Sequence, residues 1–181
     1  MKTKTLLILF LSAGILFTGN TFPAAEDGPT ILVLVRHAEK VVDGSADPLL
    51  TPMGERRAED LARVLELMDV RTIYTTPYQR TRMTAAPTAR TKGLRIREYK
   101  PGHEMDFIHK VLAEHKGETV LIVGHSNTVP RLANAAAGRD LFSDLEDKVY
   151  DNLFIAVFSG TGPAAVCRLR FGARSENNKT N

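Results

Sequence analysis

The sequence predicts an α/β fold: a three-layer, doubly wound, mainly parallel sheet with helices on both faces. Residues 30–35 (TILVLV) and 119–123 (TVLIV) are apolar runs without polar alternation, which is typical of strands covered on both sides. Segments with helical periodicity lie between the strands, and this alternation indicates right-handed crossovers. Neither an internal repeat nor a linker interrupts the pattern, so we expect one domain.

A helix is expected after the first apolar strand, over residues 51–68. Thr51 can cap its start, Pro52 suits its first turn, and apolar side chains recur at helical spacing. The next expected elements are a strand at 71–75, a helix at 79–89 that breaks at Pro87, and a strand at 94–99. This half of the chain therefore alternates between strand and helix.

The second half continues the alternation and ends in a hairpin. An amphipathic helix over 104–115 is stopped by Gly117, and a helix that opens at a Ser-Asn-Thr cluster (126–128) runs to Gly138. The last two strands flank a Ser-Gly-Thr-Gly-Pro turn and are expected at 153–158 and 164–169.

The first 25 residues (1–25) are expected to be a secretory signal peptide. Lys2 and Lys4 give a positive start, and the mostly apolar run at 6–17 is shorter than the roughly 18 residues of a spanning helix. The folded domain is then 26–173, followed by a polar, disordered tail at 174–181. We expect an extracytoplasmic protein, periplasmic or secreted, with no stable membrane span after signal removal. An uncleaved signal anchor is the alternative.

Composition excludes several classes of protein. With 43% hydrophobic and 25% charged residues, the chain is globular rather than disordered, collagen-like or coiled-coil. The formal net charge of +3 includes Lys2 and Lys4, without which 22 basic residues face 21 acidic ones. This balance argues against nucleic-acid binding. The single cysteine, Cys167, excludes an intramolecular disulfide and a cysteine-based zinc site.

Both apolar strands lead into a histidine at their carboxyl ends. The first runs into Arg36-His37 and the second into Gly124-His125. Ligands of doubly wound sheets bind beyond the carboxyl ends of the strands, so neighbouring strands would direct both imidazoles into one crevice. The alternative for either histidine alone is a structural role, which would require a polar partner.

A loop at 75–85 lies between the two histidines along the chain and leads into a helix that carries arginines. A guanidinium presents a planar fork of donors that matches phosphate oxygens, and a helix amino terminus adds backbone donors. Arg36, Arg80 and the two histidines would form a cationic cup suited to a phosphoryl group. Arg82 is expected to be a solvated surface charge.

Four segments in this order carry a resemblance to a known family. They are the Arg36-His37 strand end, the Leu50-Thr51-Pro52-Met53-Gly54 segment followed by Ala58, the Thr76-Pro77-x-x-Arg80-x-x-x-Thr84-Ala85 segment and the Gly124-His125 strand end. Together they resemble the histidine phosphatase (phosphoglycerate mutase-like) superfamily, from residue 30 to about residue 158. Two departures are Ala38, where glycine is more usual, and Thr81, where alanine is common.

The resemblance implies a phosphomonoester hydrolase that needs no metal or other cofactor. His37 would attack phosphorus and form a phosphohistidine, which water then hydrolyses. Its other ring nitrogen should donate to a backbone carbonyl. Arg36, Arg80 and His125 would hold the phosphoryl oxygens, whose negative charge persists through the transition state.

The leaving alkoxide needs a proton, and the resemblance implies an acid either directly after the second histidine or between Arg80 and that histidine. Ser126 occupies the first position, so that option is absent. Glu104 is the choice at the second, although an acidic residue at a helix start is equally explained as a dipole or capping partner. The competitors are Glu98 and Asp106.

The roles of two further acidic positions remain open. Glu39 is another candidate acid, unless it simply pairs with Lys40 or Arg36. Asp151-Asn152, at the start of a late strand, could border the crevice. A metal site built from His103 and His109 is disfavoured, because a spacing of six places the imidazoles on different sides of a helix.

The partner expected from this reading is a small phosphomonoester, and three other functions stay open. A non-catalytic phospholigand-binding module would be expected to lose one of the four cup residues, and all four are present. A mutase would need a lid, for which the segment between Arg80 and His125 is short. A protein phosphohistidine phosphatase would be separated from cytoplasmic partners by the signal peptide. Short insertions around the crevice favour an open site for varied small substrates.

Overall fold

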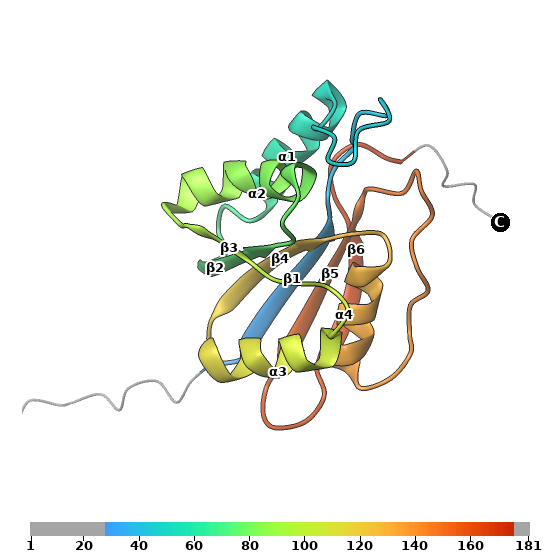
Figure 1. Cartoon of the computed structure of the whole chain (residues 1–181). Coiled ribbons are helices and arrows are strands. Elements are labelled where there is room, and N and C mark those ends of the chain that lie inside the picture. Colours follow the sequence, from blue (N-terminus) through green and yellow to red (C-terminus); the bar gives the residue numbers. More distant parts are fainter. Residues whose placement is uncertain (1–27, 176–181) are drawn as a thin grey trace, which may run out of the picture.

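The structure, a computed structural model, describes residues 28–175, which form a single six-stranded sheet with helices on both faces (Figure 1). The strands are β1 (Thr30–Arg36), β2 (Val70–Thr75), β3 (Ile96–Glu98), β4 (Thr119–Gly124), β5 (Asn152–Phe158) and β6 (Ala165–Arg170). The helices are α1 (Pro52–Val64), α2 (Gln79–Lys92), α3 (Glu104–Glu114) and α4 (Thr128–Ala137). The expected signal peptide lies outside the described residues.

The strand order β3-β2-β4-β1-β5-β6 places the two apolar strands side by side at the centre of the sheet. β1 pairs with β4 in parallel, with Arg36 opposite Gly124, and β2 and β3 continue the parallel part. β5 and β6 add an antiparallel hairpin at the other edge. The predicted doubly wound, mainly parallel α/β fold is therefore confirmed.

Each central strand contributes to two cores, one on each face of the sheet. Leu32 and Leu34 of β1 pack in the cluster that includes α3 and α4, and Val33 and Val35 pack in the cluster that includes α1 and α2. All four side chains are fully buried. This two-sided burial is the physical reason why the strand lacks polar alternation.

Two helices differ from their predicted bounds. The Thr51 hydroxyl caps α1 as expected by accepting from Gly54 N at 3.1 Å, but the helix ends at Val64 instead of residue 68. The prediction that the second helix breaks at Pro87 is wrong, because α2 continues through Pro87 to Lys92 and ends at left-handed Gly93. A proline removes one intrahelical bond, and burial of Ala85, Thr88 and Ala89 along the same helix offsets that loss.

The described chain stays folded past the expected start of the tail at residue 174. Ser175 is only 7% exposed, and its hydroxyl accepts two backbone hydrogen bonds. Residues 176–181 lie outside the described part. Within residues 28–175, no helix is both long enough and apolar enough to cross a membrane.

Candidate active site

The parallel pairing of β1 and β4 brings His37 and His125 to the same edge of the sheet. His37 N donates to the carbonyl of Gly124 over 2.9 Å, which extends the strand pairing by one residue. The two imidazole centroids lie 5.5 Å apart at an interplanar angle of 67°. The predicted convergence of the two rings is therefore present in the structure.

The hydrogen bonding of His37 leaves one ring nitrogen with a lone pair. Nδ1 lies 2.8 Å from the carbonyl oxygen of Ala38, and since a carbonyl only accepts, Nδ1 carries the proton. This is the backbone bond expected from the sequence. Burial, with a smaller contribution from the nearby Arg36 charge, lowers the pKa of His37 to about 3. His37 is therefore neutral at physiological pH, with Nε2 unprotonated.

His125 is kept neutral by similar surroundings. Burial lowers its pKa to about 4, with the charges of Arg80 and Arg36 acting in the same direction. Its Nε2 lies 2.9 Å from the Thr76 hydroxyl, which donates to the Thr81 hydroxyl over 3.1 Å. Two neutral imidazoles thus lie beside two guanidinium groups.

Gly124 lets helix α4 start directly against the end of β4. A Cβ at this position would lie 2.7 Å from Thr128 Oγ1 and 2.7 Å from the Tyr99 hydroxyl. The Thr128 hydroxyl accepts from His125 N over 2.8 Å. The absence of a side chain at Gly124 is therefore needed for the contact that fixes the His125 backbone.

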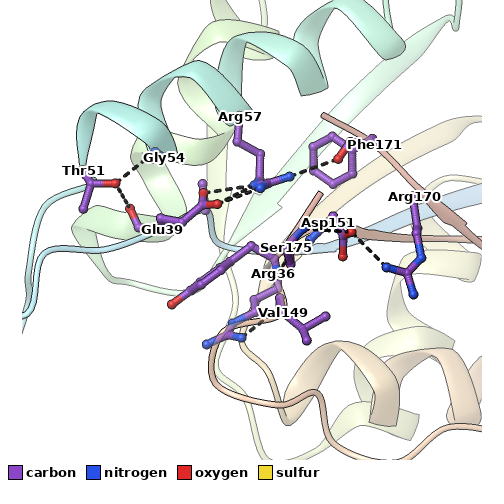
Figure 2. A network of polar contacts seen from close by, with 12 residues as sticks. Arg36, Glu39, Thr51, Gly54, Arg57, Val149, Asp151, Arg170, Phe171 and Ser175 are labelled. Carbon is purple, nitrogen blue, oxygen red and sulfur yellow. Dashed lines mark hydrogen bonds and ion pairs between the residues drawn. The ribbon is translucent and has the colours of Figure 1, made fainter. Parts of the chain in front are cut away.

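Arg36 is oriented by backbone carbonyls and by an aromatic ring. Its Nη1 donates to the carbonyl of Val149 over 2.9 Å (Figure 2) and to that of Glu146 over 2.8 Å. Its guanidinium lies 4.1 Å from the centroid of the Tyr150 ring. The Tyr150 ring lies 6.0 Å from the His37 ring. Because no carboxylate takes part in these contacts, the positive charge of Arg36 stays available to an anion.

Arg80 lies on the opposite side of the cup, in the first turn of α2. Its guanidinium stacks 4.2 Å from the Tyr78 ring, which in turn lies 5.3 Å from the His125 ring. Asp47 is 3.6 Å away, too far for a direct hydrogen bond. Within the described chain, Nε of Arg80 and Nε of Arg36 are buried without a hydrogen-bond partner.

A cavity of about 340 Å³ adjoins Arg80 and His125. Its lining includes Tyr78, Glu104 and Arg131. Glu104 is therefore the candidate acid that shares a cavity with two cup residues, and its Oε1 also accepts from Gly102 N over 3.2 Å. A larger cavity of about 850 Å³ lies between α1 and α2 and contains neither imidazole.

Two other candidates for the proton donor, Glu98 and Asp106, do not line the cavity of Glu104. Glu98, the last residue of β3, forms an ion pair with Arg82, which is half exposed as expected for a surface charge. Asp106 is exposed and lies 4.0 Å from His103. Among residues 28–175, no group of three or more His, Cys, Asp or Glu side chains could hold a metal ion.

Glu39 and Asp151 have structural partners. Glu39 pairs with neither Lys40 nor Arg36 but accepts three hydrogen bonds from Arg57, at 2.7 to 3.1 Å (Figure 2). Asp151 is buried and pairs with Arg170 at 3.0 Å rather than bordering the crevice. The expectation that Asp151 faces the site is thus not met, although its neighbour Tyr150 does so.

Sequence reasoning missed the aromatic walls of the cup. Tyr78 lies inside the motif that carries Arg80, and its position two residues before that arginine is a signal that could have been used. Tyr150 follows an irregular segment, and nothing local connects it to Arg36. Only the folded chain shows that contact, because the two residues are far apart in sequence.

Comparisons with known proteins agree with this fold. The family model of the histidine phosphatase superfamily (branch 1) matches residues 32–109. A candidate phosphohistidine phosphatase, SixA, from Nakamurella multipartitia is 23% identical, covers 81% of this chain and 98% of its own, and has a TM-score of 0.63. The protein histidine phosphatase SixA complexed with tungstate is 13% identical over 77% of this chain and 96% of its own, with a TM-score of 0.64.

A third solved structure extends the comparison to an enzyme with a different name. The phosphoserine phosphatase of Entamoeba histolytica, in complex with 3-phosphoglyceric acid, is 14% identical over 80% of this chain and 97% of its own, with a TM-score of 0.59. At these identities the likeness shows a shared fold. A search of curated proteins found no match.

Proposed function

We propose, since this chain belongs to the histidine phosphatase superfamily, that it hydrolyses small phosphomonoesters through a phosphohistidine intermediate on His37. The observation that carries the proposal is the protonation state of the His37 imidazole. Its Nδ1 proton is held by the Ala38 carbonyl and its pKa is lowered to about 3, which leaves Nε2 as a free nucleophile beside two guanidinium groups.

In the first step, the lone pair of His37 Nε2 attacks phosphorus while the bond from phosphorus to the ester oxygen breaks. Arg36 and Arg80 are positioned to stabilise the phosphoryl oxygens, whose charge remains through a loose transition state. The buried, unpartnered Nε groups of both arginines support this role, because each lacks a partner within the described residues. The departing ester oxygen requires a proton.

Glu104 is our choice for the proton donor. It shares the cavity with Arg80 and His125, next to the proposed position of the phosphoryl group. In the second step, a water molecule attacks phosphorus, the phosphorus–nitrogen bond breaks, and His37 regains its lone pair. The carboxylate of Glu104 takes the proton from that water, so the residue returns to its starting state.

The substrate class and the location are part of the same proposal. A cavity of about 340 Å³ beside the cup supports a small leaving group. The charged start and the apolar run at residues 6–17 support export, so the enzyme would act outside the cytoplasm. No metal or other cofactor is part of the proposed steps, since arginines supply the positive charge.

A second candidate function is protein phosphohistidine hydrolysis. Two of the three similar structures described above are named SixA, one as a candidate phosphohistidine phosphatase and one as a protein histidine phosphatase. The same cup would accept a phosphoryl group from either a hydroxyl or an imidazole leaving group. The imidazole that departs from a phosphohistidine does not require a strong acid, so the two functions differ in their need for Glu104.

Hydrolysis of a chromogenic phosphomonoester in the presence of a chelator tests the proposal. We expect turnover by the intact protein, its loss in His37→Ala, and an acid-labile, alkali-stable phosphoryl label on the wild-type protein that His37→Ala lacks. His109→Ala serves as the matched control, because His109 is an exposed histidine outside the cup. Turnover that requires added metal, or that survives His37→Ala, would refute the mechanism.

A further inference from the structure

The orientation of Arg36 depends on a loop without helix or strand. The carbonyls that hold Arg36 Nη1 belong to Glu146 and Val149, and the ring that stacks on it belongs to Tyr150. All three residues lie in the irregular segment 138–151 between α4 and β5. An irregular loop has no regular backbone ladder to fix it, so its contacts with the rest of the protein determine where the guanidinium points.

The end of this loop nearest Arg36 is fixed by Ser175. The Ser175 hydroxyl accepts from Tyr150 N over 2.9 Å and from Asp151 N over 3.1 Å. Ser175 N donates to Asp151 Oδ2 at 3.3 Å, and Arg170 Nη1 donates to the same oxygen at 3.0 Å (Figure 2). Asp151 is 1% exposed, so its carboxylate is held away from water.

The same C-terminal segment reaches the other side of the site. Residues 170–175, here called the C-terminal strap, contain Phe171, whose N donates to the Asp151 carbonyl over 3.0 Å. The Phe171 carbonyl accepts from Arg57 Nη1 over 3.0 Å, and Arg57 holds Glu39. Figure 2 shows the contacts of Arg57 with Glu39 and Phe171, and those around Asp151. The strap therefore joins the loop that orients Arg36 to the segment that follows His37.

We propose that Ser175 is a positioning residue, which acts on phosphate binding through Arg36. Its hydroxyl accepts the amides of Tyr150 and Asp151, and this fixes the ring and the carbonyls that hold the guanidinium towards the cup. Without the hydroxyl, the buried amide of Asp151 and the part-buried amide of Tyr150 lose their acceptor, and the loop must move to satisfy them. The proposal rests on the proposed function, in which Arg36 holds a phosphoryl oxygen.

Binding of inorganic phosphate to the full chain, measured by calorimetry, tests this role without requiring turnover. We expect Ser175→Ala to raise the Kd for phosphate about tenfold, comparable to weakening one hydrogen bond to a charged group. In an Arg36→Lys background, Ser175→Ala should change the Kd by less than about twofold, because Ser175 acts through Arg36. Ser143→Ala, at an exposed serine of the same loop, is the matched control and should bind like wild type.

The thermal unfolding of each variant is measured alongside binding. If Ser175→Ala does not fold, Arg170→Gln takes its place, because it weakens the hold on Asp151 from a half-exposed position, and we expect a several-fold rise in Kd. The proposal would be overturned if Ser175→Ala folds and binds phosphate like Ser143→Ala, or if Ser175→Ala raises the Kd equally in the Arg36→Lys background. If Ser175→Ala does not fold, an unchanged Kd in Arg170→Gln would overturn it. A wild-type protein that binds phosphate but hydrolyses no phosphomonoester would refute only the proposed function.

Discussion

The hydroxyls of Thr76 and Thr81 lie 3.1 Å apart in the interior, with Thr76 also in contact with His125. The Thr81 hydroxyl is 2.8 Å from both the Thr76 and the Tyr78 carbonyls, to which it can donate. Thr81 is one of the two positions where the sequence departs from the pattern of the histidine phosphatase superfamily. The departure therefore adds a polar group that ties the loop before α2 to the second histidine.

Replacing Thr81 with alanine should affect both stability and catalysis. The loss of a buried hydroxyl with several partners is expected to lower the free energy of unfolding by about 1–2 kcal/mol. It should also lower kcat several-fold, because Thr76 would lose a contact that orients it against His125. Denaturant unfolding and steady-state kinetics check this, with Thr81→Ser as the control that keeps the hydroxyl. Unchanged values for Thr81→Ala would show that Thr81 does not support His125.

The pH dependence of stability should reveal the buried imidazoles. The pKa of His37 falls from 6.5 to about 3 in the folded protein, so between these values the unfolded chain binds a proton that the folded chain does not. Its contribution to stability is therefore fully present above pH 6.5 and is lost as pH falls towards 3. His125, with a pKa lowered to about 4, acts in the same direction.

His37→Gln should flatten this part of the stability curve. Denaturant unfolding at a series of pH values between 7 and 4 is the measurement, and the slope of unfolding free energy against pH is the quantity compared. Direct NMR titration of the imidazole carbons should show His37 still neutral at pH 5. A midpoint near the ordinary value of 6.5 would mean that His37 is solvated in the free enzyme.

Gly124 offers a test of the close packing that positions His125. Gly124→Ala would place a Cβ 2.7 Å from Thr128 Oγ1, and overpacking of this kind costs about 1–3 kcal/mol. We expect a lower free energy of unfolding and a marked loss of kcat, because the His125 amide bonds to the same hydroxyl. Gly160→Ala is the control, since a Cβ there has no atom within 4 Å. Similar behaviour of the two variants would contradict the packing argument.

Much of the site could be predicted because its signals are local. The apolar runs of β1 and β4 identify two strands buried on both faces, and each is followed directly by its histidine. Two such strands belong at the centre of a parallel sheet, where their carboxyl ends share one edge. The Thr51 cap and the Arg80 segment are equally local. These features needed no knowledge of long-range contacts.

The supporting residues could not be predicted, because their contacts join segments that are distant in sequence. Arg36 meets Val149 across 113 positions, and Arg57 meets Phe171 across 114. The loop that holds Arg36 has no periodic pattern, and Ser175, which holds the loop, lies in the segment that the sequence predicts to be a disordered polar tail. Pro87 illustrates the reverse case, in which a correct local rule against proline in helices is overridden by the packing of α2 against the sheet.

The identity of the proton donor can be resolved by substrate chemistry. Glu104→Gln should lower kcat most for alkyl phosphates, whose leaving groups are poor, and least for nitrophenyl phosphate, whose leaving group departs without protonation. Glu98→Gln should lack this dependence, because Glu98 pairs with Arg82 and does not line the cavity of Glu104. A leaving-group dependence in Glu98→Gln instead would transfer the role to that residue.

The ion pair between Arg57 and Glu39 should behave as a buried pair and not as a surface one. The Arg57 side chain is 2% exposed and that of Glu39 is 15%, and Arg57 also donates to the Phe171 carbonyl. Removing one partner leaves an uncompensated charge, so Arg57→Met is expected to lower the free energy of unfolding by about 3–5 kcal/mol. In the Glu39→Gln background the same change should cost less, because no buried carboxylate remains.

Arg63→Met supplies the control for that measurement, because Arg63 pairs with Asp60 on the same helix with 75% of its side chain exposed. Exposed pairs contribute about 0–1 kcal/mol, so this variant should unfold nearly like wild type. If Arg57→Met and Arg63→Met were equally stable, the Arg57–Glu39 pair would not stabilise the segment that follows His37. If Arg57→Met were less stable than Arg63→Met but still bound phosphate like wild type, the pair would contribute to folding and not to the phosphate site.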